Sequence, residues 1–286
     1  MKNDWGIVGC AYMAQEYCKV LVARGITPQI FSRDLVSTNV KKFQEMFPLL
    51  TVKAFSEFSA EVDKWIVCTN IESHESICNQ LQGRIYCEKP FAHDSQYDTS
   101  KDISILFNRR YYYWVNYIKE IIDSGKIVKV MACIPERSID ALITQSIHVV
   151  DLLWYLTGPF GPATRVGKQS PSFILSTDKD IPVVINMNYG AHENFSIKFY
   201  SDDGVVYEAK PLETFGFTEG MEVREPDDDM PLRSYRPISR PLIYKPTNHK
   251  PGLEELIDDL IQNVPTRLPT LAEHHDVHVW MEKNML

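Results

Sequence analysis

The sequence predicts an α/β protein of two domains, with a parallel sheet in residues 1–110 and a largely antiparallel open sheet in residues 111–286. At 286 residues the chain exceeds one average domain. Its first half alternates strand-like and helical patterns, which is typical of βαβ units and a parallel sheet. Its second half is dominated by strand-like runs broken by Gly, Pro and Asp, which is typical of an α+β domain.

In the first half, short apolar runs alternate with segments of helical periodicity. Met13, Tyr17 and Leu21 fall on one face of the first helical segment, and Gly25 ends it. The expected strands cover residues 5–9, 29–32, 65–69 and 84–87, and the expected helices cover residues 13–24, 40–47 and 76–81.

The pattern changes after the apolar run at residues 103–110. Asp202-Asp203-Gly204 separates two strand-like runs and predicts a hairpin turn. A helix over residues 146–156 ends at Gly158-Pro159. We expect a further helix at residues 113–123, strands at residues 127–134, 182–189, 195–200 and 205–210, and an irregular surface segment at residues 226–251.

Composition excludes several classes of protein. The net charge of −8 and the absence of a Lys/Arg-rich run argue against a nucleic-acid partner. The six cysteines are scattered without a CxxC pair, and the histidines show no HxH or HExxH spacing, so we expect reduced thiols and no metal site. No apolar segment is long enough for a signal peptide or a membrane span, which predicts a cytoplasmic protein with no membrane partner.

The first turn of the chain predicts a dinucleotide site. Gly9-Cys10-Ala11-Tyr12-Met13-Ala14 follows a strand and opens a helix, as in a Rossmann domain. We therefore expect Gly9, Ala11, Tyr12 and Met13 beside the cofactor pyrophosphate, on free N–H groups at the positive end of the helix. The alternative is a tight turn without a ligand.

The end of the second strand bears on the choice of cofactor. Ser32-Arg33 stands where NAD enzymes usually place an acidic residue on the ribose. A hydroxyl beside a guanidinium suits a 2′-phosphate, which favours NADP, with NAD as the alternative. In that alternative Arg33 is a solvated loop residue and Asp34 binds the ribose.

Two further segments carry candidate catalytic groups. Lys89 follows the strand at residues 84–87, at the carboxyl edge where open α/β sheets bind ligands; otherwise it is a solvated turn residue. His148 begins the helix of the second domain among apolar neighbours, where a structural core histidine is the alternative to a catalyst.

These segments, in this order, resemble the Gfo/Idh/MocA family of NAD(P)-dependent oxidoreductases, named for glucose–fructose oxidoreductase and inositol dehydrogenase. The similarity covers nearly the whole chain, and residues 207–213 and 250–252 look like members from surface-polysaccharide sugar pathways. The matching segments are residues 6–14, Thr69-Asn70 with His74, Glu88-Lys89-Pro90, residues 107–110, and His148 and Asp151 followed by residues 152–158.

The resemblance implies a Rossmann domain followed by an α+β substrate domain, and an oxidoreductase that acts on a sugar or nucleotide sugar. It implies that His148 exchanges a proton with the substrate hydroxyl and that Lys89 is the active-site lysine, while relatives commonly form homodimers or homotetramers. The residues it places at the nicotinamide and its ribose are Thr69, Asn70, His74, Glu88 and Lys89, and those it places at the sugar are Lys89, Arg109, Thr144, His148 and Asp151.

The sequence departs from the family pattern in three places. Ala11 stands at the middle Gly of the turn, and Thr144 stands where many members have Asp. The segment between Pro90 and Phe107 is much shorter than usual, and once the apolar run from residue 103 is set aside it is close to the minimum of about 10–12 residues for a βαβ connection, so a full crossover helix hardly fits. The alternative to an enzyme is therefore a catalytically silent sugar- or nucleotide-binding protein with a regulatory or assembly role.

The short segment also predicts an unusual cover for the parallel sheet. Both faces of such a sheet are buried, yet residues 93–102 are polar and lack helical periodicity. Val277, Trp280 and Met281 form an apolar stripe near the end of the chain. We expect the helix at residues 277–286 to lie on the sheet there, with a neighbouring subunit as the alternative.

Overall fold

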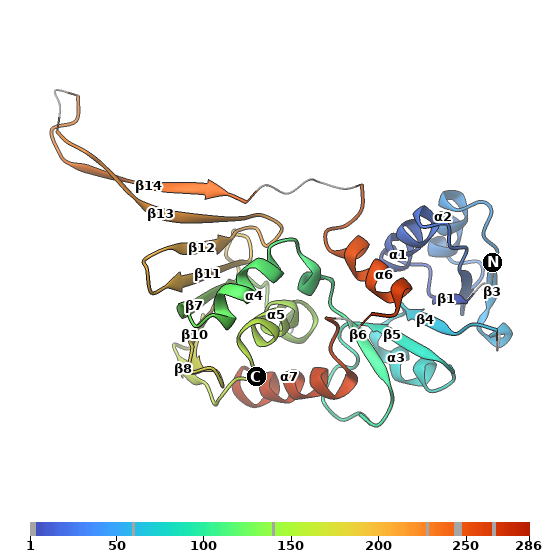
Figure 1. Cartoon of the computed structure of the whole chain (residues 1–286). Helices are drawn as coiled ribbons and strands as arrows, with labels where there is room; N and C mark the ends of the chain where they lie inside the picture. The colour runs from blue at the N-terminus through green and yellow to red at the C-terminus, as the bar shows by residue number, and fades with distance from the viewer. Residues whose placement is uncertain (1–3, 59–60, 139–140, 227–228, 243–247, 265–266) are drawn as a thin grey trace. The chain divides into compact units, whose positions relative to one another are not determined.

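The computed structural model describes residues 4–58, 61–138, 141–226, 229–242, 248–264 and 267–286 (Figure 1). It divides into two compact units. The first contains Met1–Tyr111 and Thr247–Glu282, and the second contains Tyr112–Pro246 and Lys283–Leu286. The first boundary lies next to the expected one at residue 110, but residues 247–282 belong to the first unit and not, as expected, to the second.

The described part of the first unit is a Rossmann domain. Its six strands form a parallel sheet in the order β3-β2-β1-β4-β5-β6. The elements are β1 (Trp5–Val8), α1 (Tyr12–Ala23), β2 (Gln29–Ser32), α2 (Thr38–Met46), β3 (Val52–Ala54), a 3₁₀ turn (Phe55–Glu57), β4 (Lys64–Val67), α3 (Ile71–Cys78), β5 (Arg84–Glu88), β6 (Ile103–Leu106), a second 3₁₀ turn (Asn108–Tyr111), α6 (Leu253–Gln262) and α7 (Leu271–Asn284).

One face of this sheet is covered by α1, α2 and α6. Ile7, Ile66 and Leu106 pack with buried side chains of these helices in one hydrophobic cluster. Arg24 on α1 binds Asp258 on α6 through two hydrogen bonds of 2.7 and 2.8 Å. The buried side chains of Leu253, Leu256, Ile257 and Leu260 lie in the same cluster, which explains why α6, although far along the chain, belongs to the first unit.

The opposite face is covered by α3 and α7. Helix α3 packs on β4 and β5. The segment before α7 pairs with β6, because Ile105 N–H donates a 2.9 Å bond to Pro269 O, and the ring of His274 lies 5.7 Å from that of Phe107. No helix connects β5 to β6. Helix α7 contacts this region through His274 and Glu282, which supports an in-chain cover, while the packing of Val277, Trp280 and Met281 on the sheet stays a prediction.

The second unit contains an eight-stranded, mostly antiparallel sheet in the order β14-β13-β12-β11-β7-β10-β9-β8, in which only the β7–β10 pair of the described strands is parallel. The expected α+β architecture is therefore confirmed. Its elements are α4 (Val115–Asp123), β7 (Ile127–Ile134), a π-helical turn (Leu142–Ser146), α5 (Ile147–Thr157), β8 (Thr164–Val166), β9 (Ser172–Ser176), β10 (Pro182–Met187), β11 (Ser196–Ser201), β12 (Val206–Ala209), β13 (Phe215–Arg224) and β14 (Ser234–Pro241).

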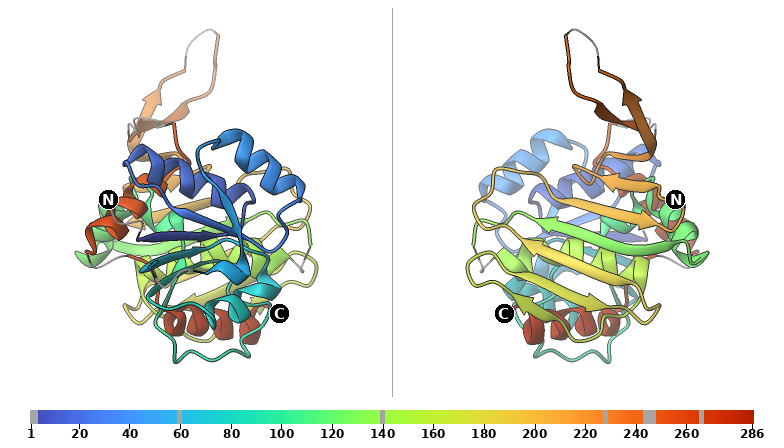
Figure 2. Two further views of the ribbon diagram at one scale, coloured as in Figure 1. Left: turned by 90° about the vertical axis from the view of Figure 1, so that its right-hand side faces the viewer. Right: turned by 90° about the vertical axis from the view of Figure 1, so that its left-hand side faces the viewer.

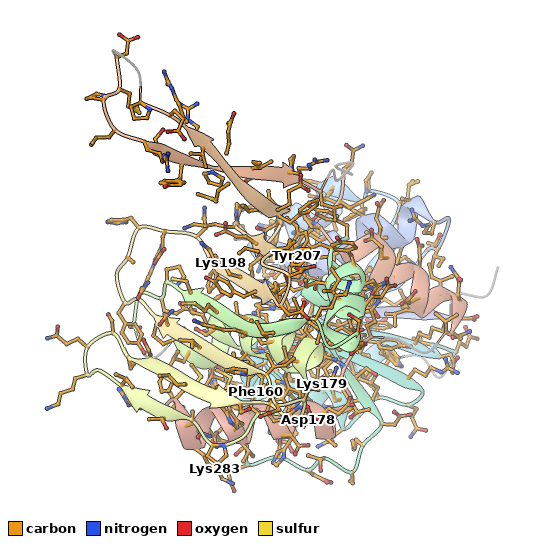
Figure 3. The ribbon with its side chains drawn as sticks, turned by 60° about the vertical axis from the view of Figure 1, so that its left-hand side comes forward. Phe160, Asp178, Lys179, Lys198, Tyr207 and Lys283 are labelled. Atoms are coloured by element: carbon orange, nitrogen blue, oxygen red, sulfur yellow. The ribbon has the colours of Figure 1, made fainter. Side chains whose placement is uncertain are left out.

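Helix α4 covers one face of this sheet (Figure 2). Tyr117 on α4 contacts the rings of Tyr207 and Phe215. On the other face Lys198 on β11 pairs with Glu208 on β12 at 3.4 Å, so Lys198 and Tyr207 point to opposite sides (Figure 3).

The expectation of an irregular segment over residues 226–251 is wrong where β14 lies. This strand pairs with β13 along its whole length and contains Pro237 and Pro241. Proline is tolerated because β14 is the edge strand of the sheet. Beyond Thr218, β13 pairs only with β14, and the two strands extend from the sheet as a ribbon (Figure 1).

Candidate functional site

A pocket of about 450 Å³ lies in the first unit at the carboxyl ends of β1, β2 and β4. Between β1 and β4 the strand order reverses, which is where open α/β sheets bind dinucleotides. Six of the predicted cofactor residues line it: Gly9, Ala11, Ser32, Arg33, Thr69 and Asn70. A hollow of about 650 Å³ over β11–β14 of the second unit contains none of the predicted residues.

The turn after β1 requires glycine at one position only. Gly9 has φ +113°, and a Cβ there would collide with the carbonyl oxygen of Cys68. Ala11, the N-cap of α1, has φ −75° and ψ −177°, which any residue adopts, and its side chain makes no cap hydrogen bond. The first turn of α1 thus carries N–H groups without a side-chain cap at the edge of the pocket.

The loop after β2 is held by its own side chains. Ser32 Oγ donates a 3.1 Å bond to Asp34 O, and Asp34 Oδ1 accepts a 2.9 Å bond from Val36 N–H. The Asp34 carboxylate therefore closes the loop. Arg33 is exposed and lines the pocket, and no described side chain forms a hydrogen bond or ion pair with it.

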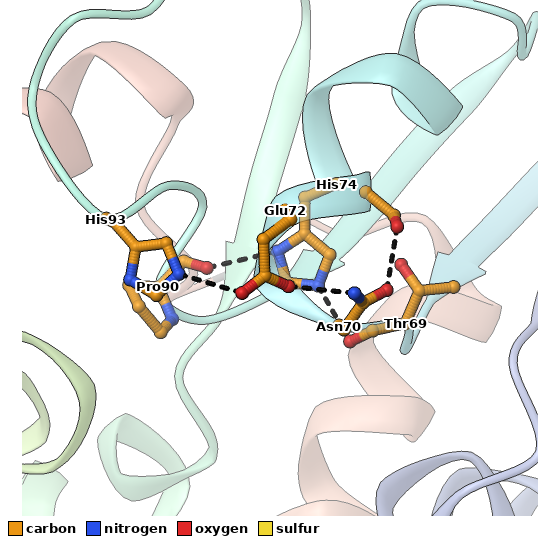
Figure 4. Close-up of polar contacts among 7 residues, drawn as sticks. Thr69, Asn70, Glu72, His74, Pro90 and His93 are labelled. Carbon is orange, nitrogen blue, oxygen red and sulfur yellow. Dashed lines mark hydrogen bonds and ion pairs between the residues drawn. The ribbon is translucent and has the colours of Figure 1, made fainter.

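The segment after β4 forms a polar network around His74 (Figure 4). Asn70 Nδ2 donates a 2.8 Å bond to Glu72, and Ser73 Oγ donates a 2.7 Å bond to Asn70 Oδ1. The ring nitrogens of His74 face Pro90 O at 3.0 Å and Thr69 O at 3.1 Å. Burial lowers the pKa of His74. His74 thus supports the pocket wall without lining the pocket.

Thr69 carries a polar atom that the fold leaves unsatisfied. Its Oγ1 is buried and has no hydrogen-bond partner among the described residues. Such an atom costs free energy unless a ligand or water satisfies it. Its place in the pocket lining is the observation that most directly favours a bound polar ligand.

Glu88 is the last residue of β5, the strand next to β4 in the sheet, and Lys89 follows it. Glu88 is buried and accepts a 2.7 Å bond from Tyr17 Oη. Burial raises the pKa of Glu88, opposed by the Tyr17 bond and by the charges of Lys89 and Lys250. Lys89 is half-buried and follows the last residue of the strand.

Tyr12 and Met13 lie at the start of α1, where they meet a residue that sequence reasoning missed. Nζ of Lys250 lies 3.2 Å from Met13 Sδ and 5.5 Å from the centroid of the Tyr12 ring. Lys250 thus adds a positive charge at this helix start. Asp34, which the NAD alternative places at the ribose, also lines the pocket, and sequence reasoning missed the remaining lining residues: Cys10, Ser37, Asn39, Phe55, Cys68, Ser73 and Ile77.

The predicted substrate residues are divided between the units. Arg109 lies on the 3₁₀ turn after β6 in the first unit. Thr144 lies on the π-helical turn, where its Oγ1 donates to Ala141 O at 3.3 Å. His148 and Asp151 are buried on α5. The last three belong to the second unit.

The thiols of the described residues are all free, and those near the pocket are protonated. Burial raises the pKa of Cys10 to about 11 and that of Cys68 well above its ordinary value. Within the described ranges no group of three or more His, Cys, Asp or Glu residues is placed to hold a metal ion. No helix described here has the length and apolar character needed to cross a membrane.

Several solved structures of dehydrogenases have the same fold as this chain. A UDP-N-acetylglucosamine 3-dehydrogenase from Acidithiobacillus ferrooxidans superimposes with a TM-score of 0.69 at 14% identity, over 97% of this chain and 95% of its own. The chain has the fold of these dehydrogenases. Myo-inositol dehydrogenase from Lactobacillus casei, solved with NAD(H) and myo-inositol, gives 0.68 at 14% identity, over 98% and 92% of the two chains.

A putative NADPH-dependent oxidoreductase from Desulfitobacterium hafniense gives a TM-score of 0.73 at 14% identity, over 98% of this chain and 94% of its own. No protein-family model and no curated protein matches the sequence. At this identity the comparisons show the fold, and they confirm the fold class that the resemblance implied.

Proposed function

We propose that this chain is an NADP-dependent oxidoreductase of the Gfo/Idh/MocA family that transfers a hydride between nicotinamide and a hydroxyl or keto carbon of a sugar or nucleotide sugar. The observation that carries the proposal is the pocket at the switch point of the parallel sheet, lined by the Gly9 turn, Arg33 and Thr69. Dinucleotides bind at this place in sheets of this order.

Three features of the pocket fit a dinucleotide. Gly9 has no side chain, so the turn after β1 packs closely on the Cys68 carbonyl and its backbone lines the pocket. The start of α1 offers N–H groups and a positive dipole to a pyrophosphate. Thr69 Oγ1 is buried without a protein partner and can bond to the cofactor.

The preference for NADP over NAD rests on the loop after β2. Arg33 stands exposed in the pocket lining, whereas Asp34 Oδ1 is engaged by Val36 N–H. A guanidinium binds a phosphate through paired charge-assisted bonds, and the neighbouring Asp34 carboxylate already accepts a bond from the backbone. A ribose 2′-phosphate at Arg33 is therefore the favoured arrangement.

The substrate class comes from the fold neighbours, which include a nucleotide-sugar dehydrogenase and an inositol dehydrogenase. Nicotinamide, when bound, supplies the hydride acceptor or donor. For oxidation, a ring nitrogen of neutral His148 takes the hydroxyl proton, and Nζ of Lys89 donates a hydrogen bond to the oxygen and stabilises its negative charge. We assign Arg109, Thr144 and Asp151 to substrate binding, as the resemblance implies.

The proposed function is tested first by binding. Titration of the purified protein with NADPH and NADH, followed by nucleotide fluorescence, should show tighter binding of NADPH. A panel of sugars and nucleotide sugars is then screened by the change in NADPH absorbance. Binding of cofactor without turnover of any substrate would favour the silent binding protein, and no binding of either nucleotide would contradict the proposal.

We further propose a homodimer or homotetramer that works in the cytoplasm. The ribbon of β13 and β14 supports the first part, because Met221, Val223 and Tyr235 on one of its faces are 53%, 47% and 58% exposed. The free cysteines of the described residues support the cytoplasmic location, because disulfides are rare there. Light scattering at several protein concentrations tests the assembly, and a monomer at all of them would contradict it.

A further inference from the structure

Each polar group of the peptide unit that joins Pro90 to Phe91 faces a nitrogen of an imidazole ring. Its carbonyl oxygen lies 3.0 Å from Nδ1 of His74 on α3, and its N–H donates a 3.3 Å bond to Nε2 of His274 on α7. His74 and His274 are 2% and 0% exposed, so water does not compete for either bond. Two helices far apart in sequence thus hold one peptide.

The bond from Phe91 defines the state of His274. Because Nε2 accepts a hydrogen bond, it carries a lone pair, and the single proton of the neutral ring is on Nδ1. Burial lowers the pKa of His274 well below 6.5, and the charges of His278, Arg110, His275 and His74 lower it further. His274 is therefore neutral under physiological conditions and remains an acceptor.

Keeping a histidine at this place costs free energy. Nδ1 of His274 is buried and has no hydrogen-bond partner among the described residues. The ring lies among the rings of Phe107, Tyr97 and His278, at centroid distances of 5.7, 6.3 and 5.8 Å. An apolar side chain would pack there without an unsatisfied N–H group. Compared with an apolar side chain, the imidazole provides one thing more, the acceptor Nε2 for the Phe91 N–H.

His74 holds the other side of the peptide and connects it to the pocket. A neutral ring has one N–H, which donates either to Pro90 O or to Thr69 O. Thr69 lines the pocket. The clamp proposed below requires the tautomer with the proton on Nδ1, which donates to Pro90 O. The ring of His74 lies between the wall of the pocket and the segment that follows Lys89 (Figure 4).

We propose that His274 is a positioning residue for Lys89, acting with His74 as a clamp on the Pro90–Phe91 peptide. The pairing of Glu88 with Leu106 in the sheet fixes the chain before Lys89. The clamp fixes the planar peptide after it, and the ring of Pro90 restricts the backbone between them. The direction in which the Lys89 side chain leaves the end of β5 is thereby set.

The inference rests on the proposed role of Lys89, but its test does not require turnover. His274→Leu removes the acceptor, His274→Gln keeps an acceptor oxygen, and His278→Leu removes a neighbouring buried imidazole that has no bond to Phe91. Two quantities are measured: hydrogen exchange of the Phe91 amide, and the rate of Lys89 acylation by acetic anhydride over a range of pH, read by peptide mass spectrometry.

We expect His274→Leu to speed exchange of the Phe91 amide about tenfold or more, since a buried hydrogen bond is lost. It should also shift the pH profile of Lys89 acylation. His274→Gln should restore both towards the wild-type values, and His278→Leu should change neither. Unchanged exchange and acylation in His274→Leu, or equal effects of His278→Leu, would overturn the proposal, the latter because packing alone would then explain it.

His74→Leu provides a second arm should His274→Leu not fold. It frees Pro90 O, and the clamp requires that the acylation profile of Lys89 shift in this variant as well; an unchanged profile would overturn the proposal. Failure of the proposed function is read separately, as absence of NADPH binding by the wild-type protein, and has no bearing on the Phe91 and Lys89 measurements.

Discussion

The hydroxyl of Tyr17 donates a 2.7 Å hydrogen bond to Oε1 of Glu88 and so joins α1 to the carboxyl end of β5. Both side chains are buried. Tyr17→Phe should lower the free energy of unfolding by about 1–3 kcal/mol, because a buried carboxyl loses its donor. Urea denaturation measures this, with Tyr235→Phe, at a 58% exposed site, as the control that should change nothing. Equal stability of the two variants would refute the importance of this bond.

Ionisation of Glu88 predicts a dependence of stability on pH. Burial raises the pKa of this carboxyl above its ordinary value of 4.5, so the folded state binds the proton more tightly than the unfolded chain. The stability from this group is full below the unfolded pKa and is lost as pH rises through the raised folded pKa.

The matching variant is Glu88→Gln, which cannot ionise and still accepts the Tyr17 bond. We expect it to be at least as stable as the wild type at neutral pH, with a difference that shrinks as pH falls towards 4.5. Melting temperatures of both proteins across this range measure it. A variant that is less stable at neutral pH and equal in acid would reverse the sign.

Local patterns located several strands well and misplaced one helix start. The expected strands at residues 29–32 and 127–134 coincide with β2 and β7. Helix α3 begins at Ile71, five residues before the expected start at residue 76. Its first turns were not recognised because Glu72, Glu75 and Ser76 are exposed polar residues, so the apolar pattern begins only later. Strand β14 was missed because its prolines indicate a loop unless the strand is known to lie at an edge.

Sequence reasoning found those pocket residues that directly follow a strand of the parallel sheet. Gly9, Arg33 and Thr69 each follow a strand of the parallel sheet, and strand ends of such a sheet meet at one edge. Lys250 and His274 reach this region from 237 and 183 residues away from their partners. No local pattern places them beside their partners, because their positions depend on how α6 and α7 pack.

The choice of cofactor is tested at Arg33. Arg33→Ala should reduce the preference for NADP(H) over NAD(H) by about 1–3 kcal/mol, the range for a charge-assisted hydrogen bond. Calorimetric titration of both nucleotides measures it, with Lys42→Ala on the exposed side of α2 as the control. Equal affinities of the wild type for the two nucleotides would rule out the proposed 2′-phosphate site.

The catalytic roles are tested at Lys89 and His148. Replacing either by Ala should leave folding and cofactor binding nearly intact and lower turnover by about a hundredfold or more, as expected for the loss of an acid–base or electrostatic group. Circular dichroism, NADPH titration and steady-state rates separate these effects. Full activity of either variant on the true substrate means that its assigned role is wrong.

Helix α7 provides the last prediction, because it stands where a crossover helix between β5 and β6 would normally lie. Besides the contact of His274 with Phe107, Glu282 accepts bonds of 2.8 and 2.6 Å from the N–H and Oγ of Ser95, in the short connection that replaces that helix. Truncation before Glu273 removes all of these contacts. The exposed sheet should then lower the melting temperature and abolish NADPH binding.

A milder variant separates the cover from the rest of the deletion. Glu282→Gln keeps α7 and weakens its bonds to Ser95 and its 3.7 Å contact with His278, so it should lower the melting temperature by less and leave NADPH bound, because charge-assisted bonds become neutral ones. Buried side chains of α7, Val277 and Met281 among them, account for the difference between the two variants. If the truncated protein melts like the wild type and still binds NADPH, α7 is not needed as the cover of this face.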